Sequence, residues 1–94
     1  MKKAALPDFK DKVVQASIVG DNHAYAMGSP HFEMQGGRLF LVGVVPPGGT
    51  SSNWSAGAVV AVDWDRVTDY LVFDSAEVYL KGREKERRYH KRNV

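Results

Sequence analysis

The chain has 94 residues, of which 44% are hydrophobic and 26% charged, with no cysteine and a formal net charge of +2 at pH 7. This length suits one compact domain spanning residues 1–94, and the composition is that of a packed globular protein rather than a disordered one. The absence of cysteine excludes disulfides and thiolate metal ligands and fits a reducing cytoplasm. Residues 1–8 contain no apolar stretch of the length of a secretory signal, and the longest apolar stretches, residues 39–47 and 56–62, are far shorter than a membrane span.

The first quarter of the chain predicts an irregular lead-in followed by two short strands. Residues 1–12 lack periodicity and contain Pro7. Residues 13–19 alternate as a strand does, with Val14, Ala16 and Ile18 on one face. Residues 24–27 can form a second strand, and we expect pairing to break at residues 28–30, because glycine is permissive and proline lacks an amide donor.

A tight hairpin is predicted at Gly36-Gly37, because paired glycines supply the positive φ angles of a two-residue turn. This turn opposes Gln35 to Arg38 and Phe32 to Leu41. Gly43, within the second strand, is expected to be a bulge or a sharp bend. The second strand is apolar on both sides, so its other face needs a cover, and the residues of that face are Phe40, Val42 and Val44.

A loop at residues 46–56, rich in Pro, Gly and Ser, carries Trp54 near its end. The indole has two interpretations, a contact for a binding partner or a lid folded over one open end of the sheet. Burial of such a ring contributes about 1.5–3 kcal/mol, which favours the lid. A strand at residues 57–64 follows, with Val60 and Val62 on one face, and residues 70–73 read as a last strand, with a helical turn through residues 67–70 as the alternative.

A helix is predicted over residues 74–81, with Asp74 as its N-cap and Glu77 three residues later. Its apolar stripe includes Tyr79 and can cover the second face of the hairpin. Gly82 either ends this helix or is passed over at a cost of about 1 kcal/mol. Residues 82–94 then form a basic tail, which is a candidate helical extension.

These elements predict an α+β, mostly β, architecture: a small curled antiparallel sheet or partly open barrel of the SH3-like or OB-like class, with four to six strands and one C-terminal helix. Charge is segregated along it. Residues 81–94 carry a net charge of +5 and residues 1–12 carry +2, whereas residues 13–80 carry −5. The two ends and the body therefore attract each other, within one molecule or between two.

Two sets of candidate binding residues follow from these patterns. Three aromatic residues are candidates for contact with a protein partner: Trp54, Phe40 and Tyr79. The alternative is nucleic acid bound by the tail, through phosphate contacts and base stacking, and its candidates are Lys85, Arg87, Arg88, Tyr89, Lys91 and Arg92. Terminal charge blocks are more often solvated helices or segments docked on an acidic body, which weakens the nucleic-acid interpretation.

No catalytic or metal motif is recognisable. The spacing of the candidate ligands Asp21, His23, His31 and Glu33 matches no metal site. The carboxylates of Asp63, Asp65 and Asp69 are expected to face solvent or to pair with Arg66 and the tail. Nucleophile-elbow and phosphate-loop motifs are absent from the sequence. We therefore predict no cofactor and no metal ligand.

The resulting functional hypothesis is a non-catalytic protein-binding or regulatory module that self-associates as a homodimer or larger assembly. A nucleic-acid-binding accessory protein acting through the tail is the alternative. A small hydrolase or metal-dependent enzyme is the third.

Overall fold

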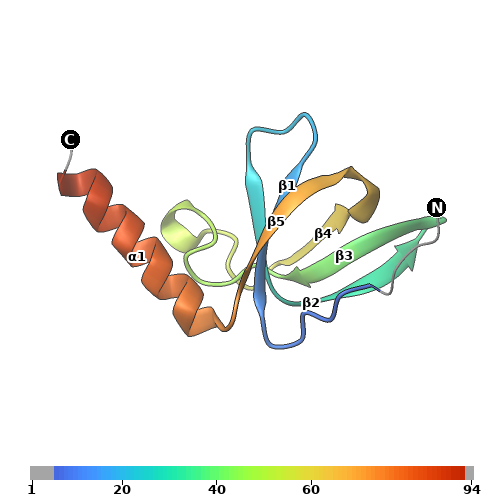
Figure 1. Cartoon of the computed structure of the whole chain (residues 1–94), viewed down its shortest axis with the longest axis horizontal. Coiled ribbons are helices and arrows are strands. Elements are labelled where there is room, and N and C mark those ends of the chain that lie inside the picture. The colour runs from blue at the N-terminus through green and yellow to red at the C-terminus, as the bar shows by residue number, and fades with distance from the viewer. Residues whose placement is uncertain (1–5, 93–94) are drawn as a thin grey trace.

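A computed structural model describes residues 6–92, with the side chains of residues 87–92 and Ser51 outside that description. It contains a five-stranded antiparallel sheet and one helix (Figure 1). The elements in chain order are β1 (Val13–Ile18), β2 (Ala24–Gln35), β3 (Arg38–Val44), β4 (Val59–Asp63), β5 (Val67–Phe73) and α1 (Ala76–Arg92). The predicted α+β class, mostly β with a C-terminal helix, is confirmed.

The sheet has the strand order β4-β3-β2-β1-β5 and does not close. Strands β1 to β4 follow one another as a meander, and β5 returns to pair with β1 on the opposite edge. One face, the core face, carries the fully buried side chains of Val14, Met27 and Leu41. The alternation predicted for the first strand is therefore correct. We call the opposite face the helix face.

The hairpin at Gly36-Gly37 forms in the predicted register, with Phe32 opposite Leu41. Both glycines have positive φ, 58° and 81°. Met34, on the same side as Phe32, is 63% exposed, because the tip of the hairpin extends beyond the rest of the sheet (Figure 1). Sharing a face with core residues therefore does not bury a side chain at the tip.

The break expected at residues 28–30 is wrong, because β2 runs through this segment with a register shift between Gly28 and His31. The first part of β2 pairs with β1, and the part after the shift pairs with β3. Gly43 lies opposite this bend. A Cβ on Gly43 would lie 2.8 Å from Met27 Cβ and 3.0 Å from the Gly28 carbonyl oxygen. Gly43 is therefore not a bulge, since the irregularity belongs to β2 and the glycine makes room for it.

The connection between β4 and β5 is a short 3-10 turn, Trp64–Arg66, that shortens the predicted strand. Asp63 begins this turn, because its Oδ1 accepts a hydrogen bond from the Asp65 backbone N at 3.1 Å. β5 starts directly afterwards, with Val67 paired to Ile18. The alternative of a helical turn through residues 67–70 is therefore wrong.

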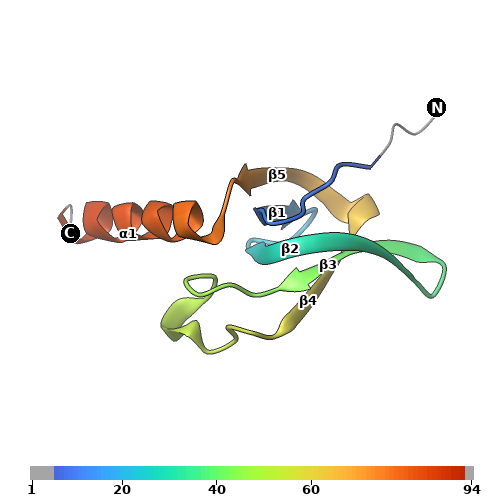
Figure 2. The same ribbon diagram turned by 90° about the horizontal axis from the view of Figure 1, so that it is seen from below.

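Ser75, and not Asp74, caps the helix. Its Oγ accepts a hydrogen bond from the Val78 backbone N at 3.1 Å, whereas the Asp74 carboxylate lies 3.4 Å from Lys12 Nζ. α1 then passes through Gly82 and continues to Arg92. Its C-terminal half points away from the sheet (Figures 1 and 2). Within residues 6–92, no helix has both the length and the apolar character to cross a membrane.

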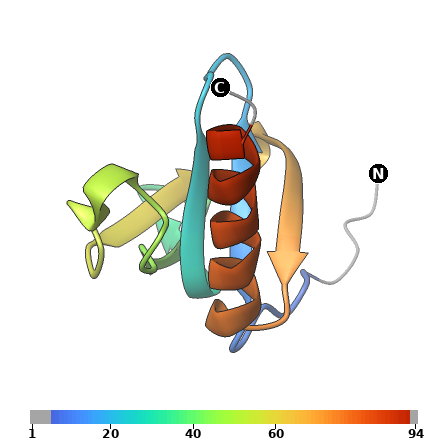
Figure 3. The ribbon, with the colours of Figure 1, turned by 90° about the vertical axis from the view of Figure 1, so that its left-hand side faces the viewer.

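The first turns of α1 hold it to the sheet through Tyr79. This side chain packs in a cluster with Val13, Ala26 and Phe73, from β1, β2 and β5. In Figure 3, α1 lies in front of β1, with β2 on one side of it and β5 on the other. The expectation that Tyr79 covers the second face of the hairpin at residues 31–45 is therefore wrong, because α1 follows β5, which lies at the other edge of the sheet from β4 and β3.

Candidate binding surface

Residues 46–57 form a loop, the Trp54 loop, whose base is closed by backbone hydrogen bonds. Val45 N donates to the Ala58 oxygen at 2.8 Å, and Gly57 N donates to the Val45 oxygen at 2.9 Å. Inside the loop, Asn53 Oδ1 accepts from Gly48 N at 2.7 Å. These hydrogen bonds within the loop hold its shape, which is typical of a preorganised binding loop.

Trp54 is 79% exposed at the end of this loop, so the lid interpretation is wrong. The bend that presents it places Ser52 and Asn53 at positive φ, 59° and 54°. Asparagine tolerates this region better than most residues, because its short polar side chain can hydrogen-bond locally. Trp64, by contrast, is partly buried against the core cluster, with its ring centroid 4.9 Å from that of Phe32.

The Trp54 loop and α1 are joined at one carbonyl. The Gly48 oxygen accepts a hydrogen bond from Arg83 Nε at 3.1 Å and a longer one from Tyr79 Oη at 3.4 Å. Gly48 has φ +85°, and a Cβ there would lie 3.0 Å from Leu80 Cδ2. Glycine at this position therefore allows the loop to approach the helix closely, so that the position of one depends on the other.

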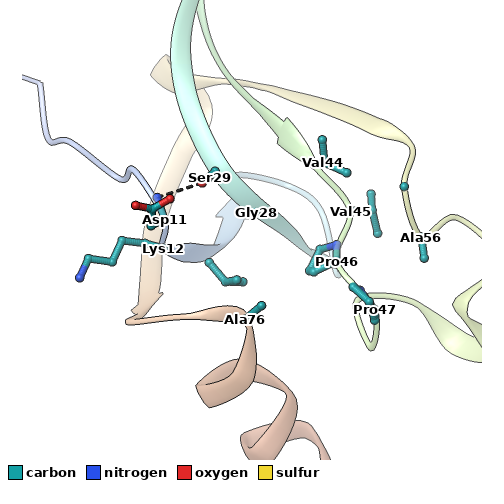
Figure 4. Close-up of a pocket in the computed structure, with 12 residues that line it drawn as sticks. Asp11, Lys12, Gly28, Ser29, Val44, Val45, Pro46, Pro47, Ala56 and Ala76 are labelled. Atoms are coloured by element: carbon teal, nitrogen blue, oxygen red, sulfur yellow. Dashed lines mark hydrogen bonds between the residues drawn. The ribbon is translucent and has the colours of Figure 1, made fainter.

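Beside the loop, a groove of 700 Å³ opens on the helix face (Figure 4). We call it the outer groove. Its apolar lining comes from β1, the end of β3, the Trp54 loop and the start of α1: Val13, Val44, Pro46, Pro47, Ala56 and Ala76. One rim is polar, and there Asp11 N donates to Ser29 Oγ at 2.9 Å.

Apolar exposure continues from the outer groove onto β4. Val44 is 46% exposed and its cross-strand neighbour Val59 is 73% exposed. Phe40, a predicted contact residue, lies on the same face and is partly buried. The far end of this strip is polar, since Arg38 pairs with Asp63, whose side chain is 10% exposed. The sequence suggested Arg66 or the tail as the partner of Asp63, but among the residues whose side chains are described the ion partner of Asp63 is Arg38, from the neighbouring strand.

Tyr79, the third predicted contact residue, is 2% exposed. Its ring meets that of Phe73 edge-on at 5.2 Å, and burial raises the pKa of its hydroxyl. The side chain thus serves the attachment of α1, and it presents no surface to a partner. Helical spacing predicted that Tyr79 lies on the face of the helix that packs on the sheet, and its burial agrees with that role.

The polar residues considered for metal or proton chemistry lie in separate pairs. Tyr25 Oη donates to Asp21 at 2.6 Å, which lowers the pKa of that carboxyl and raises the pKa of the tyrosine. Gln35 and His31 together lower the pKa of Glu33, with His31 Nε2 3.6 Å from Glu33 Oε2. No group of three or more potential metal ligands occurs in the described part of the chain.

Residues 82–92 of the basic tail continue α1, and residues 93–94 lie outside the described residues. Lys85 is exposed on this part of the helix. The backbone of the other predicted nucleic-acid contacts is helical, but their side chains lie outside the described residues: Arg87, Arg88, Tyr89, Lys91 and Arg92. In the described part, the helix meets its own chain through its first turns and Arg83.

Sequence reasoning missed two parts of this surface, the Arg83 contact to Gly48 and the exposed Val44–Val59 pair. No local signal marks the first, because the partners are 35 residues apart. The sequence pattern showed the second only as apolar residues on two predicted strands, without indicating that they pair and stay exposed. Comparison with family models, with curated proteins and with solved structures gives no match.

Proposed function

We propose that this protein is a non-catalytic protein-binding module that contacts its partner through Trp54 and the adjoining outer groove. The observation that carries the proposal is the 79% exposure of the indole on a loop held by its own hydrogen bonds. A small domain gains stability by burying such a ring, so its exposure has a cost that binding recovers. Tryptophan is also among the residues most enriched at the energetic centres of interfaces.

The geometry of the loop supports this role. A partner that covers Trp54 also meets Val44 and Val59 or the apolar wall of the outer groove, since these adjoin the base of the loop. Because the loop is already fixed, little conformational entropy is lost when it is covered. The attachment of the loop to α1 through Gly48 gives the module a route for regulation, because movement of the helix moves the binding loop.

The test compares the immobilised full chain with Trp54→Ala as bait in extracts of the native host. Met34→Ala is the matched control, since Met34 is 63% exposed and lies at the tip of the β2–β3 hairpin. We expect a protein retained by the wild type and by Met34→Ala but lost with Trp54→Ala. Equal retention by all three baits would contradict the proposal.

Binding of nucleic acid by the tail is the second candidate, favoured by the projection of a continuous basic helix away from the sheet (Figure 2). Its test is the affinity of the full chain for RNA and DNA as salt is raised, beside a chain with Lys85, Arg87 and Arg88 replaced by Ala. Phosphate contacts predict a steep salt dependence that these replacements flatten. An unchanged salt slope would argue against the tail as the binding element.

Self-association is part of the proposed function, supported by the exposed apolar strand residues and by the opposite charges of body and tail. Sedimentation of the full chain at low and physiological salt tests it, and a monomer at every concentration would remove it. Cytoplasmic localisation stays a prediction from the cysteine-free composition.

A further inference from the structure

β5 is an edge strand without the usual protection. It pairs with β1 on one side, and its outer side carries no further strand among the described residues (Figure 3). Edge strands are commonly protected by lysine, proline or a covering segment. β5 has the sequence VTDYLVF, with Asp69 as its one charge, and Tyr70, Leu71 and Val72 are 40%, 59% and 45% exposed. Such a strand is suited to pairing with another.

We propose that a second copy of this chain pairs with β5 through its own β5, in antiparallel orientation about a two-fold axis at Leu71. The inference rests on the proposed self-association and assigns the surface responsible for it. The result is a continuous ten-stranded sheet with one isologous interface.

The register follows from the exposed side chains. A two-fold axis at Leu71 opposes the two Leu71 side chains on the helix face and opposes Tyr70 to Val72 of the second copy on the core face. These are the three exposed apolar residues of the strand. Directly opposed apolar and aromatic pairs of this kind are the units that stabilise a sheet.

Charge selects the antiparallel orientation. In this register Asp69 of the second copy lies opposite Phe73, on the helix face. Phe73 borders a hollow of 590 Å³ beside α1, and the charged residues that line it are Lys81, Lys85 and Glu84, which give it a net charge of +1. Each copy thus brings its strand carboxylate toward a rim of net positive charge on the other. A parallel pair would instead bring the two basic helices together, which like-charge repulsion disfavours.

The experiment uses single engineered cysteines, because the chain has none of its own. Leu71→Cys places two thiols opposite each other at the axis, within reach of a disulfide after small adjustment. Val59→Cys, which is 73% exposed on β4, tests the competing edge of the sheet. Under mild oxidation we expect a covalent dimer from Leu71→Cys, formed faster than from Val59→Cys. Faster linkage of Val59→Cys would overturn the proposal.

Sedimentation equilibrium supplies the second measurement. Leu71→Lys removes an apolar contact and opposes two like charges, so we expect the dimer dissociation constant to rise at least about tenfold. Met34→Lys, at the exposed tip of the β2–β3 hairpin, is expected to leave it unchanged. If both variants dimerise as the wild type does, self-association stands and the β5 interface is refuted. If the wild type itself is a monomer at every concentration, the self-association on which the inference rests is refuted as well.

Discussion

Replacing Gly43 by Ala tests how the sheet accommodates the bend in β2. The new methyl group would lie 2.8 Å from Met27 Cβ, 3.0 Å from the Gly28 oxygen and 3.2 Å from Pro30 Cβ. Comfortable contacts between carbon atoms are about 3.5–4.0 Å, so the neighbours must move by several tenths of an ångström. Two of them are a fully buried side chain and a backbone carbonyl, and neither can turn aside freely.

Overpacking of this kind costs about 1–3 kcal/mol, and the rigid surroundings of Gly43 place it in the upper half of that range. A loss of about 2–3 kcal/mol lowers the melting temperature by roughly 8–24 °C in a domain of this size. Urea denaturation followed by tryptophan fluorescence measures the change. We expect a lower midpoint with an unchanged slope, because the surface exposed on unfolding stays the same.

Gly82→Ala is the matched control, since the same methyl group has room there. The nearest heavy atom would be Phe73 Cε2 at 3.9 Å, and the residue lies inside α1. Alanine is the better helix former, so this variant is expected to gain about 0.5–1 kcal/mol. A Gly43→Ala stability within about 0.5 kcal/mol of the wild type, a change typical of unconstrained surface sites, would refute the steric argument.

Three further predictions concern polar groups. Burial raises the pKa of Tyr79, so the stability gained by burying the neutral hydroxyl is complete below pH about 10 and is lost as pH rises through the folded-state pKa. Thermal melts across pH 9–12 measure this alkaline loss of stability, and Tyr79→Phe should reduce it. Arg38→Ala leaves the Asp63 carboxylate without its ion partner and should lower the free energy of unfolding by about 1–3 kcal/mol, measured by urea denaturation. A smaller loss of stability in the double variant with Asp63→Asn would identify the unpaired charge as the cause. Tyr25→Phe removes the donor that lowers the pKa of Asp21, so an NMR titration of the carboxyl carbon should show that pKa rising toward its ordinary value. A pKa that stays low would point instead to the hydrogen bond that the His23 backbone N donates to Asp21.

The sequence by itself determined those features that depend on neighbours in the chain. The Gly36-Gly37 turn set the register of β2 and β3, because two positive φ angles leave few ways to join two strands. The alternation in β1 identified which side chains face the core, since successive residues of a strand point to opposite sides. Charge segregation was likewise readable directly from the order of residues.

Contacts between segments far apart in the chain were decided by the tertiary structure. Helical spacing predicted that Tyr79 faces the sheet, but the position of β5 at the sheet edge determined that Tyr79 packs on β1 and the first part of β2, at Ala26, rather than on the hairpin at residues 31–45. The sequence predicted Asp74 as the N-cap, but Ser75 holds that position, and the carboxylate of Asp74 instead lies near Lys12 from the start of the chain. Burial favoured Trp54 as a lid, yet hydrogen bonds inside its loop hold it outward. A short-range pattern specifies which side of an element is apolar, while the three-dimensional packing of remote segments decides what covers that side and what is left exposed.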